Sequence, residues 1–141
     1  MRVRVYIAGA IQNGDIFQNI RQAEDAFKEL ANLGYAPFCP HWGCYGGNVS
    51  PTTMMVDGCM GIMETRTLVA RPKPCSMGLS HDQWLDIDES WVFASHALLR
   101  LPGESPGADK EIMFANRYGC KIFYDIPTLH NHFEAEKKRR G

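Results

Sequence analysis

The sequence predicts an α/β fold, in which a parallel sheet is covered by helices on both faces. Short runs of β-branched, aromatic and aliphatic residues alternate along the chain with longer segments of helical spacing. The first run, residues 3–8, alternates only weakly between polar and apolar residues, as expected of a strand buried on both faces. With 141 residues, the chain is long enough for the core of one domain but not of two.

The ends of the predicted elements carry residues that stop or cap them. Gly34 and Gly119 end two helices, because glycine readily adopts the conformation needed there. Ser80, with Gln83 three residues later, forms a capping box at the start of another. The predicted strands are 3–8, 35–39, 97–101 and 120–124, and the predicted helices are 17–33, 80–94, 107–118 and a closing helix from Pro127.

Residues 41–79 interrupt this alternation with an irregular, methionine-bearing insert, in which a short helix is possible at 54–65. Such segments are typical of a lid or of an adaptable apolar contact, here a contact between subunits. We therefore expect one domain spanning 1–141, with this insert. Its architecture is a flavodoxin/Rossmann-like three-layer sandwich with strand order 2-1-3-4 and a possible extra strand.

The composition argues against several classes of function. The net charge of -1 leaves no basic excess to neutralise a nucleic-acid polymer, and no apolar run approaches the roughly 20 residues that cross a membrane. Five cysteines without framework spacing, after an N-terminus without a secretion signal, predict reduced thiols and a cytoplasmic protein. A zinc site using Cys39, Cys44, Cys59 and Cys75 is the weaker alternative, since these lack paired C-x-x-C spacing. We expect neither a metal nor a cofactor.

Two carboxylates fall on the apolar faces of their helices. Asp88 lies on the stripe of Trp84, Leu85, Trp91 and Val92, whereas Asp82, Asp86 and Glu89 lie off it. Glu111 lies on the face marked by Ala108, Ile112, Ala115 and Tyr118. Each could be a buried acid with a structural partner. Two acids on the helices that flank one strand, however, favour a pair that divides acid and nucleophile chemistry between two environments.

Two loops should meet at the carboxyl ends of the first and third strands, where an open parallel sheet binds ligands. The first is residues 9–13, with Gly9 and Ile11, and the second is residues 102–107, with Ser105 and Gly107. Glycine permits close approach of a ligand to the backbone, and a serine at a helix N-terminus offers donors to an anion. With Asp109 in the first helical turn, these residues are the candidates for substrate binding.

These residues together resemble the nucleoside 2-deoxyribosyltransferase-like superfamily. The resemblance rests on residues 5–9 (VYIAG), 34–38 (GYAPF) and 98–111, with the run GESPGADKE, and covers nearly the whole chain except 45–79. Within the superfamily the chain looks closest to small proteins of bacteria and their phages. It is more distantly similar to the 2'-deoxynucleoside 5'-phosphate N-hydrolases.

The resemblance implies a role for each matching residue. Glu111 matches the nucleophilic glutamate and Asp88 the acid that assists the leaving base, while Tyr6 and Gly9 match residues that line the sugar pocket. Ser105 corresponds to the serine that holds the 5'-phosphate in the hydrolases. A hydroxyl tolerates phosphate where a carboxylate would repel it, which favours a nucleotide substrate.

The implied reaction is cleavage of the N-glycosidic bond of a (deoxy)nucleoside or its 5'-monophosphate, through a covalent glutamyl-sugar intermediate and with release of the free base. Base exchange by a deoxyribosyltransferase and a non-catalytic nucleotide-binding module are the alternatives; a flavin-binding protein is a weaker one. The partner is thus a small nucleoside or nucleotide. The resemblance also implies a homodimer or larger homo-oligomer, with Trp42 and the insert as candidate contacts.

Overall fold

A computed structural model of the protein describes residues 1–10, 13–40, 55–56, 59–60 and 79–141. In this part of the chain four parallel strands form a sheet in the order β2-β1-β5-β6, which confirms the predicted order 2-1-3-4. The strands of the sheet are β1 (Arg4–Ala8), β2 (Ala36–Phe38), β5 (Ala97–Arg100) and β6 (Lys121–Phe123). The helices are α1 (Ile16–Asn32), α3 (His81–Ala94), α4 (Pro106–Tyr118) and α5 (Ile126–Arg140).

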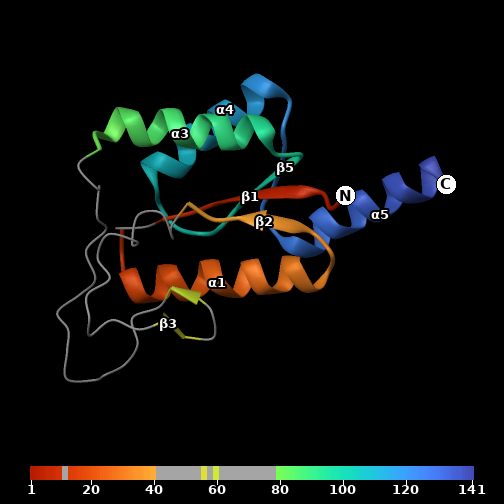
Figure 1. The fold of residues 1–141 in the computed structure, drawn as a ribbon, viewed down its shortest axis with the longest axis horizontal. Coiled ribbons are helices and arrows are strands. Elements are labelled where there is room, and N and C mark those ends of the chain that lie inside the picture. The colour runs from red at the N-terminus through yellow and green to blue at the C-terminus, as the bar shows by residue number, and fades with distance from the viewer. Residues whose placement is uncertain (11–12, 41–54, 57–58, 61–78) are drawn as a thin grey trace.

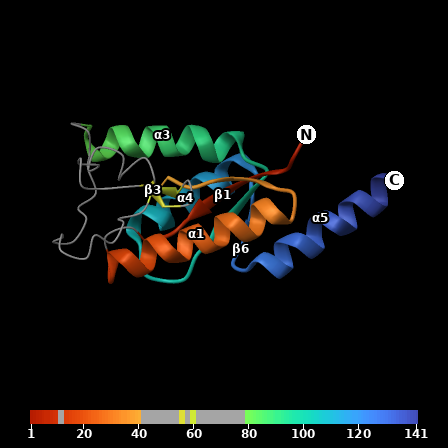
Figure 2. The same ribbon diagram turned by 60° about the horizontal axis from the view of Figure 1, so that its bottom comes forward.

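The helices form two layers, one on each face of the sheet (Figure 1). On one face, α1 and α5 bury residues such as Leu30 and Leu129 against Ile7 and Leu99. On the other face, α3 and α4 bury Val92 and Ala115 against the alternate strand residues, including Tyr6 and Leu98. Seen from a second direction, α1 and α5 lie on the near side, and the C-terminal end of α5 extends away from the sheet (Figure 2). The predicted three-layer sandwich is therefore confirmed.

The carboxyl edge of the sheet contains a topological switch point at the centre of the molecule. β1 pairs with β2 on one side and with β5 on the other, so the connections after β1 and β5 diverge from neighbouring strand ends. In α/β sheets this is where ligands bind. The register aligns Tyr6 with Leu98 and Ala8 with Arg100, which places these four side chains on the face covered by α3 and α4, because side chains alternate along a strand.

The caps that end the helices agree with the sequence in most places. Ser80 and Gln83 form the predicted capping box of α3, and Gly119 ends α4 in the left-handed conformation with φ of 70°. α4 begins at Pro106, two residues earlier than a start after Gly107 would give, because the Ser105 side chain caps it. In α5, Pro127 stands one residue after the first helical position.

The structure corrects the prediction in two other places. Residues 55–56 (β3) and 59–60 (β4) form an antiparallel pair, so the possible helix at 54–65 is wrong for these residues, and the rest of the insert lies outside the described residues. Two aromatic residues predicted to face inward are partly exposed: Trp91 stacks on Phe38, and Tyr118 donates a hydrogen bond to Glu89. Such rings combine a large apolar surface with a position at the edge of the core.

Candidate active site

Glu111 is a buried carboxyl in the second turn of α4. Its residue exposure is 6%, and the Tyr6 hydroxyl from β1 donates a hydrogen bond to Oε1 at 3.0 Å. Within the described part of the chain, the other oxygen, Oε2, is buried and has no hydrogen-bond partner. Burying a carboxyl costs free energy that such partners normally offset. Tyr6 thus holds one oxygen of Glu111 in place, while the other oxygen is enclosed in the protein.

Asp88 is the second carboxyl of the site and comes from α3. It is half-buried, and burial raises its pKa to about 6. Burial, together with the charge of Asp88 nearby, raises the pKa of Glu111 to about 8. Two carboxyls that affect each other in this way titrate as a pair, so near neutral pH the pair holds close to one proton. This is the charge state that acid and nucleophile chemistry at one centre requires.

Both carboxyls line one cavity of about 350 Å³ at the carboxyl edge of the sheet. This volume lies within the range of small-molecule pockets, roughly 300–1,000 Å³. One wall comes from α3 and the opposite wall from the start of α4, with the ends of β1 and β2 between them. The lining residues are Gly9, Asn13, Pro40, His81, Trp84, Leu85, Asp88, Ser105, Pro106, Gly107, Ala108 and Glu111.

The turn before α4 supplies the donors of this cavity. Ser105 is buried, and its Oγ accepts a hydrogen bond from the Ala108 amide at 3.1 Å. The hydroxyl still has its own hydrogen to donate. A Cβ added at Gly107 would meet only Ser105 Oγ, at 3.9 Å, and the backbone of Gly107 does not need positive φ. Neither packing nor conformation therefore requires glycine at this helical position, where a side chain would extend toward the cavity that Gly107 lines.

The other predicted binding residues have different surroundings. Tyr6 is fully buried behind Glu111 rather than on the cavity wall, so its contact is with the carboxyl. Gly9 lines the cavity, and a Cβ there would meet Leu101 at 3.1 Å, so close packing requires this glycine. Asp109 points away: its side chain is 69% exposed, and it is not among the lining residues. Ile11 lies outside the described residues.

No sequence pattern marked His81 or Pro40 for this cavity, and helical spacing placed Trp84 and Leu85 only on a helix face. Trp84 and Leu85 precede Asp88 by one helical turn, so helical spacing alone could have placed them beside it. His81 lies one further turn back, at the exposed start of α3, and its charge lowers the pKa of Asp88. Pro40 comes from the end of β2, whose position next to β1 follows only from the sheet order.

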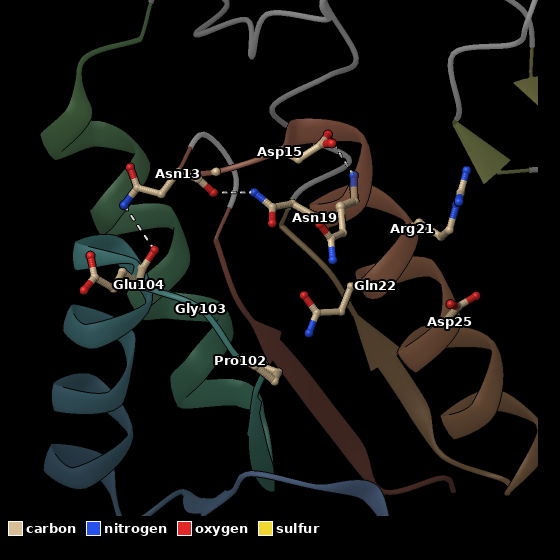
Figure 3. Close-up of a pocket in the computed structure, with 11 residues that line it drawn as sticks. Asn13, Asp15, Asn19, Arg21, Gln22, Asp25, Pro102, Gly103 and Glu104 are labelled. Atoms are coloured by element: carbon tan, nitrogen blue, oxygen red, sulfur yellow. Dashed lines mark hydrogen bonds between the residues drawn. The ribbon is translucent and has the colours of Figure 1, made fainter.

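A second, more open cavity of about 720 Å³ lies beside the first half of α1 (Figure 3). Here Asn13 joins the two loops at the sheet edge: its Nδ2 donates to Glu104 O at 3.1 Å, and its carbonyl accepts from Asn19 Nδ2 at 2.8 Å. The polar side chains around this cavity, among them Arg21 and Asp25, are mostly exposed. Among the described residues that line this second cavity there is no buried ionisable group, so the smaller cavity with the carboxyl pair is the better candidate for chemistry.

In the described part of the chain, no group of three or more histidine, cysteine or acidic residues could hold a metal ion. Cys39 is buried there, while Cys44 and Cys75 of the weaker zinc hypothesis lie outside it. Nor does a search of the described helices find one that combines the length and the apolar character of a membrane span.

Comparison with known proteins yields matches in structure only. No protein-family model and no curated protein sequence matches the chain. A solved structure of a conserved protein from Enterococcus faecalis V583 is similar, with a TM-score of 0.53 and 15% identity over 86% of this chain and 62% of that one. A 2-deoxyribosyltransferase from Bacillus psychrosaccharolyticus gives a TM-score of 0.49 and 17% identity over 85% of this chain and 69% of its own. The first match supports the fold alone. The second has a TM-score below 0.5 and supports no further conclusion.

Proposed function

We propose that this protein is an enzyme of the nucleoside 2-deoxyribosyltransferase-like superfamily that cleaves the N-glycosidic bond of a nucleoside 5'-monophosphate or nucleoside and releases the free base. The observation that carries the proposal is the pair Glu111 and Asp88, which come from two helices and line one cavity at the switch point of the sheet. A buried acid oriented by Tyr6 and a second acid at lesser depth are the groups that such a cleavage needs.

In the first step, Glu111 attacks the anomeric carbon of the sugar as the bond to the base breaks. Oε2 is the oxygen available for the new bond, since Oε1 accepts from the Tyr6 hydroxyl. The bonding electrons leave with the base, and Asp88 donates the proton that neutralises it. Water then attacks the same carbon, and Asp88 takes up a proton from it as the ester to Glu111 breaks.

The shared proton must lie on Asp88 when the bond breaks. In the free protein the deeper burial of Glu111 favours its protonated form. As positive charge develops on the sugar beside Glu111, its carboxylate form is stabilised and the proton is favoured on Asp88 or the departing base. The hydrogen bond from Tyr6 acts in the same direction, because donation to a carboxylate favours its charged form.

Ser105 and Gly107 line the cavity from the start of α4 and support a 5'-phosphate there, whereas Trp84 and Leu85 line it from α3. The start of α4 contributes the Ser105 hydroxyl, the positive end of the helix dipole and space at Gly107. On the α3 side, the indole and the leucine give an apolar wall suited to the face of a base. We place the sugar between these two sides, over Glu111.

The test is incubation with a panel of ribo- and deoxyribonucleosides and their 5'-monophosphates, with free base measured by chromatography. Release should fall by at least about 10³-fold in Glu111→Gln and persist in Glu89→Gln, a matched change at a surface acid on α3 that pairs with Arg117. Release unaffected by Glu111→Gln removes the proposed nucleophile. Transfer to an added second base would identify base exchange, and tight binding without release would identify a binding module.

We also propose that the protein is cytoplasmic and assembles as a homodimer or larger homo-oligomer. On α3 and α4, the apolar side chains Ile87, Trp91, Phe93, Met113 and Tyr118 are exposed, and these support a contact between subunits. The free thiol of Cys120 is consistent with a reducing compartment. Light scattering after gel filtration tests the assembly, and an active, strictly monomeric species would contradict it.

A further inference from the structure

Arg100 is a buried cation at the carboxyl end of β5, on the face of the sheet that carries the candidate site. Its residue exposure is 8%, and it follows three buried apolar residues of the same strand. Burying a guanidinium costs free energy, and the positive end of the α4 dipole nearby adds to this cost. The contacts that Arg100 makes must therefore offset the free-energy cost of burying its charge.

The guanidinium holds the turn that leads to Ser105. Its Nη1 donates to the Leu101 carbonyl, and its Nη2 donates to the Gly103 carbonyl at 2.8 Å. Nη2 also lies 3.5 Å from Oδ1 of Asp109 in the first turn of α4. The turn passes through Gly103, whose φ is +113°. Because the glycine backbone is conformationally permissive, this residue by itself does little to make the turn rigid. Arg100 thus ties the end of β5 to the turn and to the start of α4.

The same side chain places a positive charge behind Glu111. Arg100 lies two residues along β5 from Leu98, which pairs with Tyr6, and Tyr6 holds Glu111. The groups that act on the pKa of Glu111 are Tyr6 from β1, Asp88 from α3 and Arg100 from β5. His81 in turn acts on Asp88, and Asp109 lies next to Arg100. The charge of Arg100 lowers the pKa of Glu111, against the effects of burial and of Asp88.

We propose that Arg100 is a positioning residue of the active site, which fixes the turn that presents Ser105 and supplies the buried positive charge that keeps Glu111 able to ionise. The proposal deepens the proposed function and rests on the nucleophilic role of Glu111. Arg100 itself touches neither the substrate nor the reacting atoms. The hydrogen-bond donors of its guanidinium hold the turn in place, and its charge favours the ionised form of Glu111.

The test separates these two contributions without requiring turnover. The pKa of Glu111 is measured by ¹³C NMR on protein with labelled glutamate side chains, assigned with Glu111→Gln. Arg100→Gln should raise the pKa of Glu111 measurably, since removing a nearby positive charge disfavours the ionised carboxylate. Arg100→Lys should leave it near the wild-type value. Arg117→Gln removes the same charge from an exposed arginine paired with Glu89 and should change nothing.

The second readout is amide hydrogen exchange in the turn. Arg100→Lys lacks the guanidinium fork, so the amides of residues 103–105, 107 and 108, above all the Ala108 amide bonded to Ser105, should exchange at least about fivefold faster. If Arg100→Gln folds, an unmoved pKa of Glu111 overturns the electrostatic half. If it does not fold, Arg100→Lys still decides: unchanged exchange in the turn overturns the positioning half.

The two proposals can fail independently. Absence of base release by the wild-type protein would refute the proposed function and leave the pKa and exchange measurements as they are. If base is released, Arg100→Gln should move the pH dependence of kcat upward by the same amount as the pKa of Glu111. Equal pH profiles for Arg100→Gln and Arg117→Gln would contradict the role of Arg100.

Discussion

Replacing Glu111 by glutamine should stabilise the protein at alkaline pH. Burial and the charge of Asp88 raise the pKa of this carboxyl from 4.5 to about 8 on folding. Between these values the folded protein binds the proton more tightly than the unfolded chain, so the free energy of unfolding decreases as pH rises. The free-energy cost of ionising this buried carboxyl is absent below pH 4.5 and complete above pH 8. Glutamine avoids it, because its amide is neutral at every pH and has nearly the shape of the protonated acid.

The size of the effect follows from the pKa. At about 1.36 kcal/mol per pH unit, the change from 4.5 to about 8 sets a ceiling of about 5 kcal/mol. Because Asp88 shares the proton, a single substitution recovers only part of this, and we expect about 2–4 kcal/mol above pH 8. For a chain of this length that raises Tm by roughly 10 °C.

The assay is thermal and denaturant unfolding of the wild type, Glu111→Gln and the surface control Glu89→Gln, at pH 5 and pH 8.5. The advantage of Glu111→Gln should be close to zero at pH 5 and large at pH 8.5. For Glu89→Gln, the stability difference from the wild type should not increase between pH 5 and pH 8.5, because Glu89 is a surface carboxyl bonded to Arg117 and Tyr118. A stability difference independent of pH, or a loss of stability at pH 8.5, would refute the reasoning about burial.

Four further substitutions test the walls of the cavity. Ser105→Asp keeps a good N-cap but adds a negative charge, so the ratio of kcat/KM for monophosphate over nucleoside should fall by about 10–100-fold, and an unchanged ratio would place the phosphate elsewhere. Gly107→Ala should raise stability by about 0.5–1 kcal/mol yet raise KM, and unimpaired binding would show that the space is not used. Gly9→Ala should instead lower Tm, since its Cβ would meet Leu101 at 3.1 Å. Asp88→Asn should slow release of poor leaving bases more than of good ones; equal slowing would argue against proton donation.

Much of the fold could be predicted from the sequence because local and global preferences agree. The apolar runs and helical stripes alternate in the order that a parallel sheet requires, and caps such as Ser80 with Gln83 mark the helix starts. Glu111 and Asp88 stood out for the same reason, as acids on faces that otherwise pack inward. A violation of the pattern at one residue is visible in the sequence, and here it coincides with the cavity.

Contacts between distant segments could not be predicted in this way. The hydrogen bond from Tyr6 to Glu111 joins residues 105 positions apart, and only the register of β1 against β5 and the packing of α4 bring them together. Arg100 could have been singled out from the sequence, because it is a charged residue inside a buried apolar run. The antiparallel pair of residues 55–56 and 59–60 was missed because methionine-rich spacing does not distinguish short strands from a helix.

The most direct test of the nucleophile is to trap its ester with the sugar. The protein is mixed with substrate, quenched in acid and analysed by mass spectrometry, intact and after digestion. The expected result is one added sugar, or sugar phosphate, on the peptide that contains Glu111, formed as base appears and absent in Glu111→Gln. Base release with no adduct in rapid-quench samples, or an adduct on another residue, would contradict covalent catalysis by Glu111.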